Sequence, residues 1–358
     1  MTLIRKYKPG DEHGISAFMK RCFLKDIRTE IRSHEPEYYA WKYGGGPWGE
    51  NIALIAEDEG KVVGLFCIMP KRLKVNDEIM LVGETGDAYT DPDYQGKGLF
   101  FKMISQAFTE IKKQGITSFY TTANDIALKI WTGLFRFEKL FDYQSVFRPL
   151  DYNAILRQKL KWRWLSKLTA WPLAMIDHLL IRRDWSGRHS HSSLALTDAS
   201  DPVFDVCWEA LGAEYSFTIV KDRSYMACRF GSSPESYQIY VYREKDEPLG
   251  YVVVKMVPMF GLKCGLIVDW LVGARASGQM KRMLRLICAE MQKQGVHFTA
   301  TWVVPESMAG RAFRRFGFIK RKKTVHLVAG GAMQKESFFE NMRQSAEWLF
   351  THGDSDNI

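Results

Sequence analysis

The chain has 358 residues, of which 46% are hydrophobic and 25% are charged, with a net charge of +9. This length suffices for two domains of ordinary size and the apolar content suffices for packed cores, so a wholly disordered protein is excluded. The positive charge attracts anions such as nucleotide phosphates or anionic lipid, without choosing among them. The sequence contains no paired Cys/His finger, so we expect no nucleic-acid partner.

The start of the chain and its cysteines indicate a cellular compartment. Early charge in Met1 to Arg5 is not followed by the apolar core of a signal peptide. The six cysteines are scattered without a Cys-x-x-Cys pair, which predicts reduced thiols and neither a disulfide frame nor a zinc site. No uninterrupted apolar stretch reaches about 18 residues, so we expect a cytoplasmic protein without a membrane span or a metal.

In chain order, the first 150 residues alternate short strands with helices. Apolar runs predict strands at 4–7, 52–56, 62–69, 73–75, 79–82 and 116–121. Amphipathic spacing predicts helices at 11–23, from Leu99 to Gly115, and from Asn124 through Trp131. This order predicts a mixed α/β sheet, mostly antiparallel, with one parallel pair around the central helix.

The most informative segment joins a strand to that central helix. Its residues are Gln95, Gly96, Lys97, Gly98, Leu99 and Phe100. Two glycines one residue apart let a loop turn its N–H groups toward one point, and the helix start adds free N–H groups and the positive end of its dipole. Lys97 can add a charge at the rim. The segment therefore predicts a phosphate seat, and the alternative is an ordinary surface turn.

The order strand, Gln-x-x-Gly, helix resembles the acyl-CoA pyrophosphate loop of the GCN5-related N-acetyltransferases. By this resemblance the pyrophosphate of acetyl-CoA, or of another acyl-CoA, meets residues 95–100. The pantetheine arm and the acyl carbonyl would meet the strand backbone at Ala88, Tyr89 and Thr90. Phe100 departs from the family pattern, in which Gly or Ala is usual, so its ring either points away from the cofactor or reshapes the loop.

Two acidic residues precede the loop and are candidates for the general base. Glu84 lies eleven residues before Gln95, which matches the glutamate base of histone-type family members. Asp87 follows three residues later, and on an extended strand the two side chains face opposite sides. We therefore expect only one of them to reach the acceptor. The alternatives are that both are polar residues at a strand end or salt-bridged supports, and that a water relays the proton or no dedicated base exists.

Asn124 and Trp131 fall on the next family motif, in which the asparagine touches the pantetheine arm and a tyrosine is the usual acid. Here Trp131 occupies the tyrosine position, and an indole does not titrate as an acid. Tyr143 or Tyr120 is then the candidate acid, unless the thiolate leaves unprotonated. Asn124 is equally a candidate helix cap.

Several short sequence motifs of the first half recur in the same order in the second half of the chain. Trp41-Lys42-Tyr43-Gly44 resembles Cys228-Arg229-Phe230-Gly231, and Lys113-Gln114-Gly115 resembles Lys293-Gln294-Gly295. We infer two tandem copies of one fold, at 1–150 and 195–330. The second copy has no Gly-x-Gly in its loop at 272–280. We therefore expect the first copy to bind the cofactor and the second to shape the acceptor pocket.

Two further segments complete the predicted domain organisation. Residues 151–194 form a basic, Trp-rich linker, and residues 331–358 form a C-terminal helix and tail. Alternating basic and tryptophan residues within 156–183 are typical of an interdomain helical hairpin, or of an amphipathic helix on the inner face of an anionic membrane. The last residues, 347–356, are expected to be a solvated end, with closure over a pocket as the alternative.

Together these features predict an acyltransferase that moves an acetyl or other short acyl group from CoA to a primary amine by direct attack. An amino sugar on a nucleotide or lipid carrier is one candidate acceptor. Two alternatives stay open. One is an enzyme like the peptidoglycan aminoacyl transferases, which use charged tRNA, and the other is a non-catalytic CoA- or ligand-binding protein.

Overall fold

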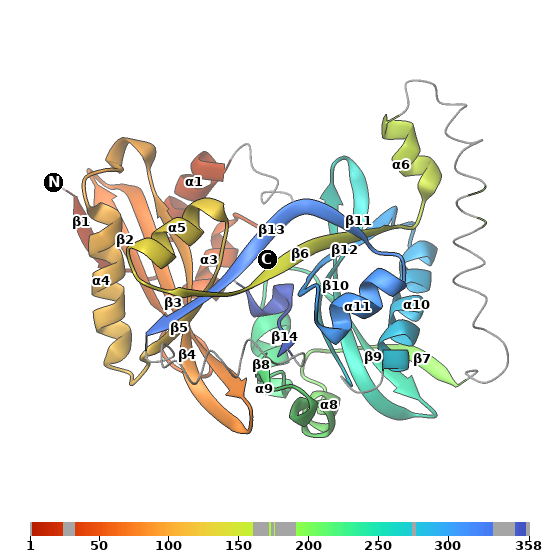
Figure 1. Cartoon of the computed structure of the whole chain (residues 1–358). Coiled ribbons are helices and arrows are strands. Elements are labelled where there is room, and N and C mark those ends of the chain that lie inside the picture. Colours follow the sequence, from red (N-terminus) through yellow and green to blue (C-terminus); the bar gives the residue numbers. More distant parts are fainter. Residues whose placement is uncertain are drawn as a thin grey trace.

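The computed structural model describes residues 2–23, 33–159, 172, 175, 191–273, 277–331 and 348–355. Two halves lie side by side, and strands β6 (Glu138–Pro149) and β13 (Ile319–Gly331) run across between them (Figure 1). The C-terminal segment that the structure describes, residues 348–355, lies in the middle, between the halves. The predicted fold class, a large mixed sheet flanked by helices, is confirmed.

The first half contains most of the elements that the sequence predicts. In order they are β1 (Leu3–Lys6), α1 (Glu12–Phe23), α3 (Pro36–Tyr43), β2 (Ile52–Asp58), β3 (Lys61–Val75), β4 (Glu78–Thr90), α4 (Leu99–Lys112), β5 (Ser118–Ala123), α5 (Asp125–Gly133) and β6. The strands predicted separately at 62–69 and 73–75 are one strand, β3. The break is absent because antiparallel pairing with β4 continues through Pro70, which lies opposite Gly83.

The second half repeats this order, with one additional strand, β8, between its first two helices. Its elements are β7 (Ser192–Thr197), α8 (Val203–Leu211), β8 (Phe217–Ile219), α9 (Arg223–Met226), β9 (Gln238–Glu244), β10 (Glu247–Met259), β11 (Leu262–Val272), α10 (Ser277–Lys293), β12 (Phe298–Val303), α11 (Met308–Arg315) and β13. The parallel pair β11·β12 corresponds to the parallel pair β4·β5. Helix α6 (Tyr152–Lys159) follows the first copy, and the short strand β14 (Trp348–Leu349) pairs with β8.

The two copies exchange their last strands. β13 of the second copy pairs with β5 of the first, with His326 opposite Ala123, and β6 of the first copy pairs with β12 of the second, with Phe298 opposite Pro149. β6 and β13 also pair with each other, so a single sheet passes through both copies. The predicted boundaries at 150 and 195 stay a prediction, but neither copy completes its sheet without a strand from the other.

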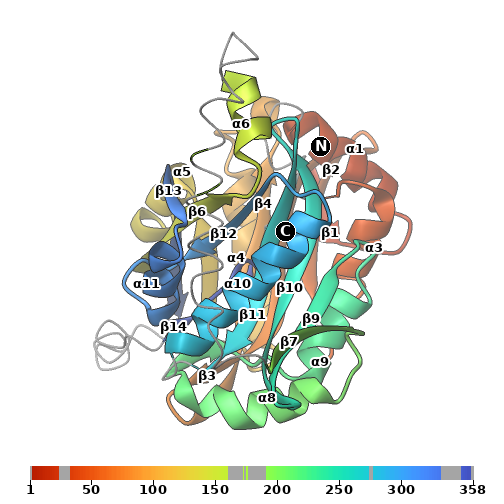
Figure 2. The same ribbon diagram turned by 90° about the vertical axis from the view of Figure 1, so that its right-hand side faces the viewer.

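The central strands of each copy are covered on both faces. In the first copy Leu54 and Phe66 pack with α4, while their neighbours Ile55 and Leu65 pack with α1 and α3. Strands buried on both faces are continuous apolar runs, which is why β2 and β3 lack a polar alternation. In the second copy α10 lies along the sheet (Figure 2).

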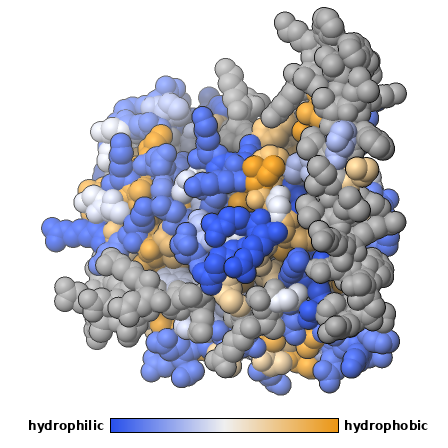
Figure 3. All heavy atoms as spheres, turned by 45° about the vertical axis from the view of Figure 1, so that its right-hand side comes forward, coloured by the Kyte–Doolittle hydropathy of each residue, from blue (hydrophilic) through white to orange (hydrophobic). Residues whose placement is uncertain are grey.

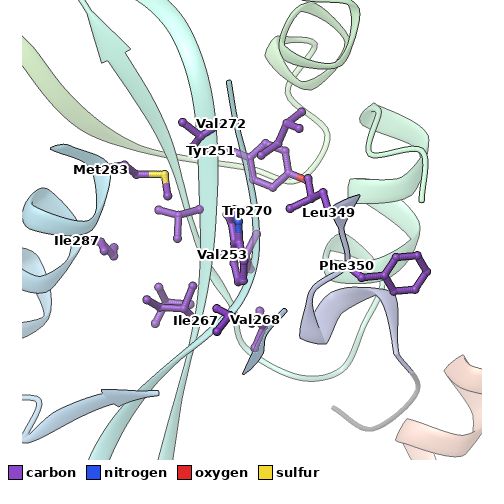
Figure 4. Close-up of a cluster of buried hydrophobic side chains, with 14 of the residues drawn as sticks. Tyr251, Val253, Ile267, Val268, Trp270, Val272, Met283, Ile287, Leu349 and Phe350 are labelled. Carbon is purple, nitrogen blue, oxygen red and sulfur yellow. The ribbon is translucent and has the colours of Figure 1, made fainter. Parts of the chain in front are cut away.

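The core of the second copy also includes the end of the chain. Met283 and Ile287 of α10 lie on one side of Val253 and Ile267, and Leu349 and Phe350 of the C-terminal segment lie on the other (Figure 4). On the face in Figure 3, hydrophilic residues cover much of the described surface and hydrophobic ones gather in small groups. No helix within the described ranges is long and apolar enough to cross a membrane. The linker predicted at 156–183 lies mostly outside those ranges.

Candidate functional site

A cavity of about 850 Å³ opens where β4 and β5 separate. The two strands are paired in parallel only at Gly83 and Glu84, opposite Phe119 and Tyr120, and β4 then continues alone to Thr90. Residues 86–90 of β4 and Thr121, Thr122 and Asn124 at the end of β5 line the space between them. The carboxyl ends of parallel strands are the usual place for a ligand in such sheets, and the volume lies within the roughly 300–1,000 Å³ of ordinary ligand pockets.

The predicted glycine loop forms one wall of this cavity. The side-chain amide of Gln95 donates to the carbonyl oxygen of Thr90 at 3.0 Å, which folds the loop back onto the end of β4. Gly96 and Gly98 both have φ of +74°, which side chains rarely adopt, and open space lies where a Cβ would stand. Gly98 is the N-cap of α4 and offers no side-chain cap, so the first N–H groups of the helix lack a side-chain acceptor there. This is the geometry that an anion seat requires.

Two side chains of the loop have roles that the sequence left open. Phe100 is half-buried, packs against the core of the first copy, and still borders the cavity. Gly96 and Gly98 line the same cavity, so the Phe100 ring does not close the loop off from it. Lys97 is exposed and does not line the cavity; its Nζ donates to the carbonyl oxygen of Asp93 at 2.9 Å.

Helix α5 forms the opposite wall. The side-chain oxygen of Asn124 accepts from the N–H groups of Ile126 and Ala127, at 3.1 and 2.9 Å, so the helix-cap prediction is confirmed. Asn124 also borders the cavity, together with Ile130 and Trp131. The Trp131 ring is buried among aromatic rings of the first copy, and its 3% exposure leaves only an edge for a ligand.

The two candidate bases lie in different places, and both are engaged. Asp87 borders the cavity, but its carboxylate lies 2.6 Å from the Nζ of Lys42 and accepts from the Tyr43 hydroxyl at 2.5 Å. Glu84 does not line this cavity; it is 2% exposed, faces a separate small cavity, and lies 3.6 Å from the Nζ of Lys71. A register shift between β3 and β4 near Asp87, with φ of +46°, accompanies this divergence.

Tyr143, the candidate acid, is fully buried in β6 and is not part of the cavity lining. Its hydroxyl has no hydrogen-bond partner. Burial and the nearby carboxylates of Asp354 and Glu84 raise its pKa well above the ordinary value, which makes it a weak acid. Tyr120, the other candidate, donates its hydroxyl to the carbonyl oxygen of Asp354 at 2.9 Å.

The rest of the cavity is built by β6, by the second copy and by the C-terminal segment. The sequence predicted that the second copy shapes the acceptor pocket and left closure by the C-terminal end as an alternative, but it did not identify the individual residues. This part of the lining includes Ser145, Thr301, Trp302, Arg321 and His352. The His352 ring stacks on Trp302, with ring centroids 3.8 Å apart. The sequence indicated this part of the cavity only through its internal repeat. In the repeat, β12 of the second copy corresponds to β5 of the first.

The C-terminal segment is anchored by a buried cluster of charges. The Nζ of Lys221 lies 2.7 Å from the carboxylate of Asp269 and 2.6 Å from that of Asp354, and all three side chains are fully buried. Asp354 also accepts from the N–H of Thr351, and Arg229 donates to the carbonyl oxygen of Gly353 at 3.0 Å. The expectation of a solvated end is therefore wrong for residues 348–355. Within the described residues, no cluster of three or more His, Cys, Asp or Glu is arranged to hold a metal ion.

Comparisons with known proteins agree with this arrangement. Residues 3–129 match the family model described as an acetyltransferase (GNAT) domain. No curated protein sequence matches the chain. Among solved structures, a GCN5-related N-acetyltransferase from Anabaena variabilis is similar with a TM-score of 0.60 at 13% identity, over 92% of this chain and 72% of that one.

Two further structures share the fold. Saccharomyces cerevisiae N-myristoyltransferase with bound myristoyl-CoA aligns with a TM-score of 0.64 at 10% identity, over 92% of this chain and 82% of that one. A probable N-acyltransferase from Enterococcus faecalis aligns with a TM-score of 0.59 at 10% identity, over 92% and 72%. At such low sequence identities these structures show a shared fold alone. The match to the family model covers residues 3–129. Residues 3–129 thus match an acetyltransferase (GNAT) domain, and the chain as a whole has the fold of these acyltransferase structures.

Proposed function

We propose that this protein transfers a short acyl group, acetyl being the first candidate, from acyl-CoA to a primary amine by direct attack in a ternary complex. The observation that carries the proposal is the loop at 95–100. Two left-handed glycines and an uncapped helix start border a ligand-sized cavity at the same point. In this arrangement the CoA pyrophosphate takes the loop, because both the free N–H groups and the helix dipole favour an anion.

The pantetheine arm then runs between β4 and β5. Within the described residues, β4 pairs with β5 no further than Glu84, and residues 86–90 line the cavity on that side. Pantetheine contains two amides, which can pair with a strand edge as a peptide does. Thr121 and Asn124 lie across the gap. This path carries the thioester toward the part of the cavity that the second copy lines.

The acceptor amine enters from that second-copy side. Attack of its nitrogen on the thioester carbonyl needs the two groups held together, and this proximity supplies much of the rate. Asp87 and Glu84 stay proposals as bases, with ion pairs to Lys42 and Lys71 that favour a supporting role. An amino-sugar acceptor, contact with a membrane through 156–183 and a cytoplasmic location also stay proposals.

Ligand-dependent stabilisation tests the proposal. Acetyl-CoA, a longer acyl-CoA and free CoA are each added at increasing concentration, with ADP as a control for general anion binding. A specific ligand at 100 times its Kd stabilises the native state by about 2.7 kcal/mol, which raises the melting temperature by several degrees. We expect acyl-CoA to shift the transition and ADP to do so far less. Equal shifts with ADP, or no shift with any acyl-CoA, would contradict the proposal.

A further inference from the structure

The acceptor side of the cavity contains one histidine with an unusual combination of contacts. The His352 side chain is 3% exposed and its ring stacks on Trp302, yet its buried Nδ1 has no hydrogen-bond partner within the described residues. A buried polar group without a partner costs free energy, so natural proteins seldom leave one without a reason. Because His352 lines the cavity, a ligand there can supply the missing partner.

The backbone around His352 is held far more firmly than a chain terminus normally is. Lys221 fixes Asp354, whose carbonyl oxygen also accepts from Tyr120, and Arg229 binds the carbonyl oxygens of Gly353 and Ser355. Hydrogen bonds thus fix the turn that carries His352 and leave the buried Nδ1 of its ring without a partner among the described residues. A binding or reacting side chain needs a backbone that is held in place by such surrounding contacts.

Five other titratable groups border the cavity, and each is less suited to accept the proton of the acceptor amine. They are His34, Asp87, Tyr89, Tyr94 and Arg321. Asp87 is paired with Lys42, and the Tyr94 hydroxyl donates to Asp58 at 2.7 Å. His34 belongs to the first copy and its Nδ1 lies 2.7 Å from the Tyr39 hydroxyl, whereas the acceptor side of the cavity is lined by the second copy and the C-terminal segment. Tyr89 is a phenol, and Arg321 is a cation that cannot accept a hydrogen bond. Among the described lining residues, the imidazole of His352 is therefore the best-placed acceptor for a proton.

We propose that His352 accepts a hydrogen bond from the amino group of the acceptor and takes its proton as the amide bond forms; this inference rests on the function proposed above. Burial lowers the pKa of the His352 imidazole to about 3, so the ring is neutral at physiological pH and one nitrogen keeps its lone pair. The same desolvation favours the neutral form of an amine that enters the cavity, which is the nucleophilic form.

The atoms and electrons of the step balance without another reactant. The lone pair of the amine forms the C–N bond, the C–S bond breaks, and its electron pair leaves with the CoA sulfur. The nitrogen proton becomes strongly acidic once the nitrogen shares its electrons with the carbonyl, so even a weakly basic imidazole takes it. His352 then passes the proton to the thiolate, which leaves as free CoA and restores the neutral ring.

A pair of CoA analogues tests the hydrogen bond without knowledge of the acceptor. The first carries S-CH2-C(O)-NH-CH3 in place of the thioester, and the second carries the N,N-dimethyl amide, which lacks the N–H. Calorimetric titration of the full-length protein should show that the N–H analogue binds about 3- to 10-fold more tightly, the value of one hydrogen bond. His352→Phe keeps the ring stacking but removes the nitrogens, so this preference should vanish. His352→Gln, which keeps an acceptor, should retain part of it.

Controls separate failure of this inference from failure of the proposed function. His13→Gln replaces an exposed histidine on α1 and should bind both analogues as the wild type does. Equal binding of the two analogues by the wild type, or an unchanged preference in His352→Phe, would overturn the role of His352 while leaving acyl-CoA binding intact. Failure of both analogues and of acetyl-CoA to bind would overturn the proposed function and this inference together.

Discussion

The Nζ of Lys221 lies 2.6 Å from the Oδ1 of Asp354, and both side chains are fully buried although 132 residues of chain separate them. Asp269 shares the same lysine at 2.7 Å, so one buried cation faces two carboxylates. Burial raises the pKa of Asp354, and Lys221 opposes this shift. The cluster connects the C-terminal segment to the second copy, and through His352 to the cavity.

Removal of the lysine charge from this cluster should lower the free energy of unfolding more than removal of one carboxylate charge. Lys221→Met leaves two buried carboxylates without their cation and should lower the free energy of unfolding by about 3–5 kcal/mol. Asp354→Asn keeps the shape and leaves Lys221 paired one-to-one with Asp269, so its cost should be clearly smaller. Urea unfolding of both variants measures the difference. Equal losses would show that charge balance does not determine the stability of the cluster.

The exchanged strands predict that the two copies depend on each other for folding. A fragment of residues 1–150 leaves β5 without β13, and β6 without β12 and β13. Unpaired strand edges are unstable and prone to association. The fragment alone should therefore lack a cooperative unfolding transition by circular dichroism, while co-expression of 1–159 with 191–358 should restore one. Cooperative unfolding of the isolated fragment would contradict the interdependence.

Local features of the site could be predicted from the sequence. Gly96 and Gly98 allow the backbone to turn at the head of an amphipathic helix, and both the loop and α4 follow from residues close in sequence. The cap at Asn124 is similarly local. Such features depend on propensities and spacing that need no knowledge of distant partners.

Long-range features could not be predicted. The apolar alternation of β6 is compatible with pairing to the sheet of either copy. Only the tertiary contacts decide that β6 pairs with β12. The polar C-terminal residues around His352 and Asp354 looked solvated because their partner, Lys221, is far away in sequence. The ion pair of Asp87 with Lys42 was hidden for the same reason.

Removal of the Asp87 charge should test its role as a support. Lys42 and Asp87 are 3% and 1% exposed, so Asp87→Asn leaves a buried ammonium without its counter-ion. We expect a loss of about 3–5 kcal/mol in the free energy of unfolding. Glu50→Gln, which removes an exposed ion pair with Lys6, should cost less than about 1 kcal/mol. If Asp87→Asn instead keeps full stability and loses only turnover, Asp87 is the base.

The buried imidazole predicts a pH dependence of stability. The pKa of His352 is lowered to about 3 in the folded chain from 6.5, so below pH 6.5 the unfolded chain binds a proton that the folded chain does not. Stability should therefore fall as the pH drops from 6.5 toward 3, by up to about 1.4 kcal/mol per unit. Between pH 7 and pH 5 the wild type should lose about 2 kcal/mol more than His352→Gln in urea unfolding. Parallel losses in the two proteins would show that this histidine is not buried in its neutral form.

A comparison of two glycine variants tests the phosphate seat most directly. Gly98 and Gly115 flank α4 with φ of +74° and +78°, and open space lies where a Cβ would stand at both. Glutamate at either position should cost about 1–2 kcal/mol of backbone strain, but only Gly98→Glu places a carboxylate at the loop. Calorimetric titration with acetyl-CoA should show that Gly98→Glu binds at least about 100-fold more weakly and that Gly115→Glu binds as the wild type does. A loss of about 100-fold corresponds to a few kcal/mol of charge repulsion and lost N–H contacts. Equal affinity in the two variants would contradict the account.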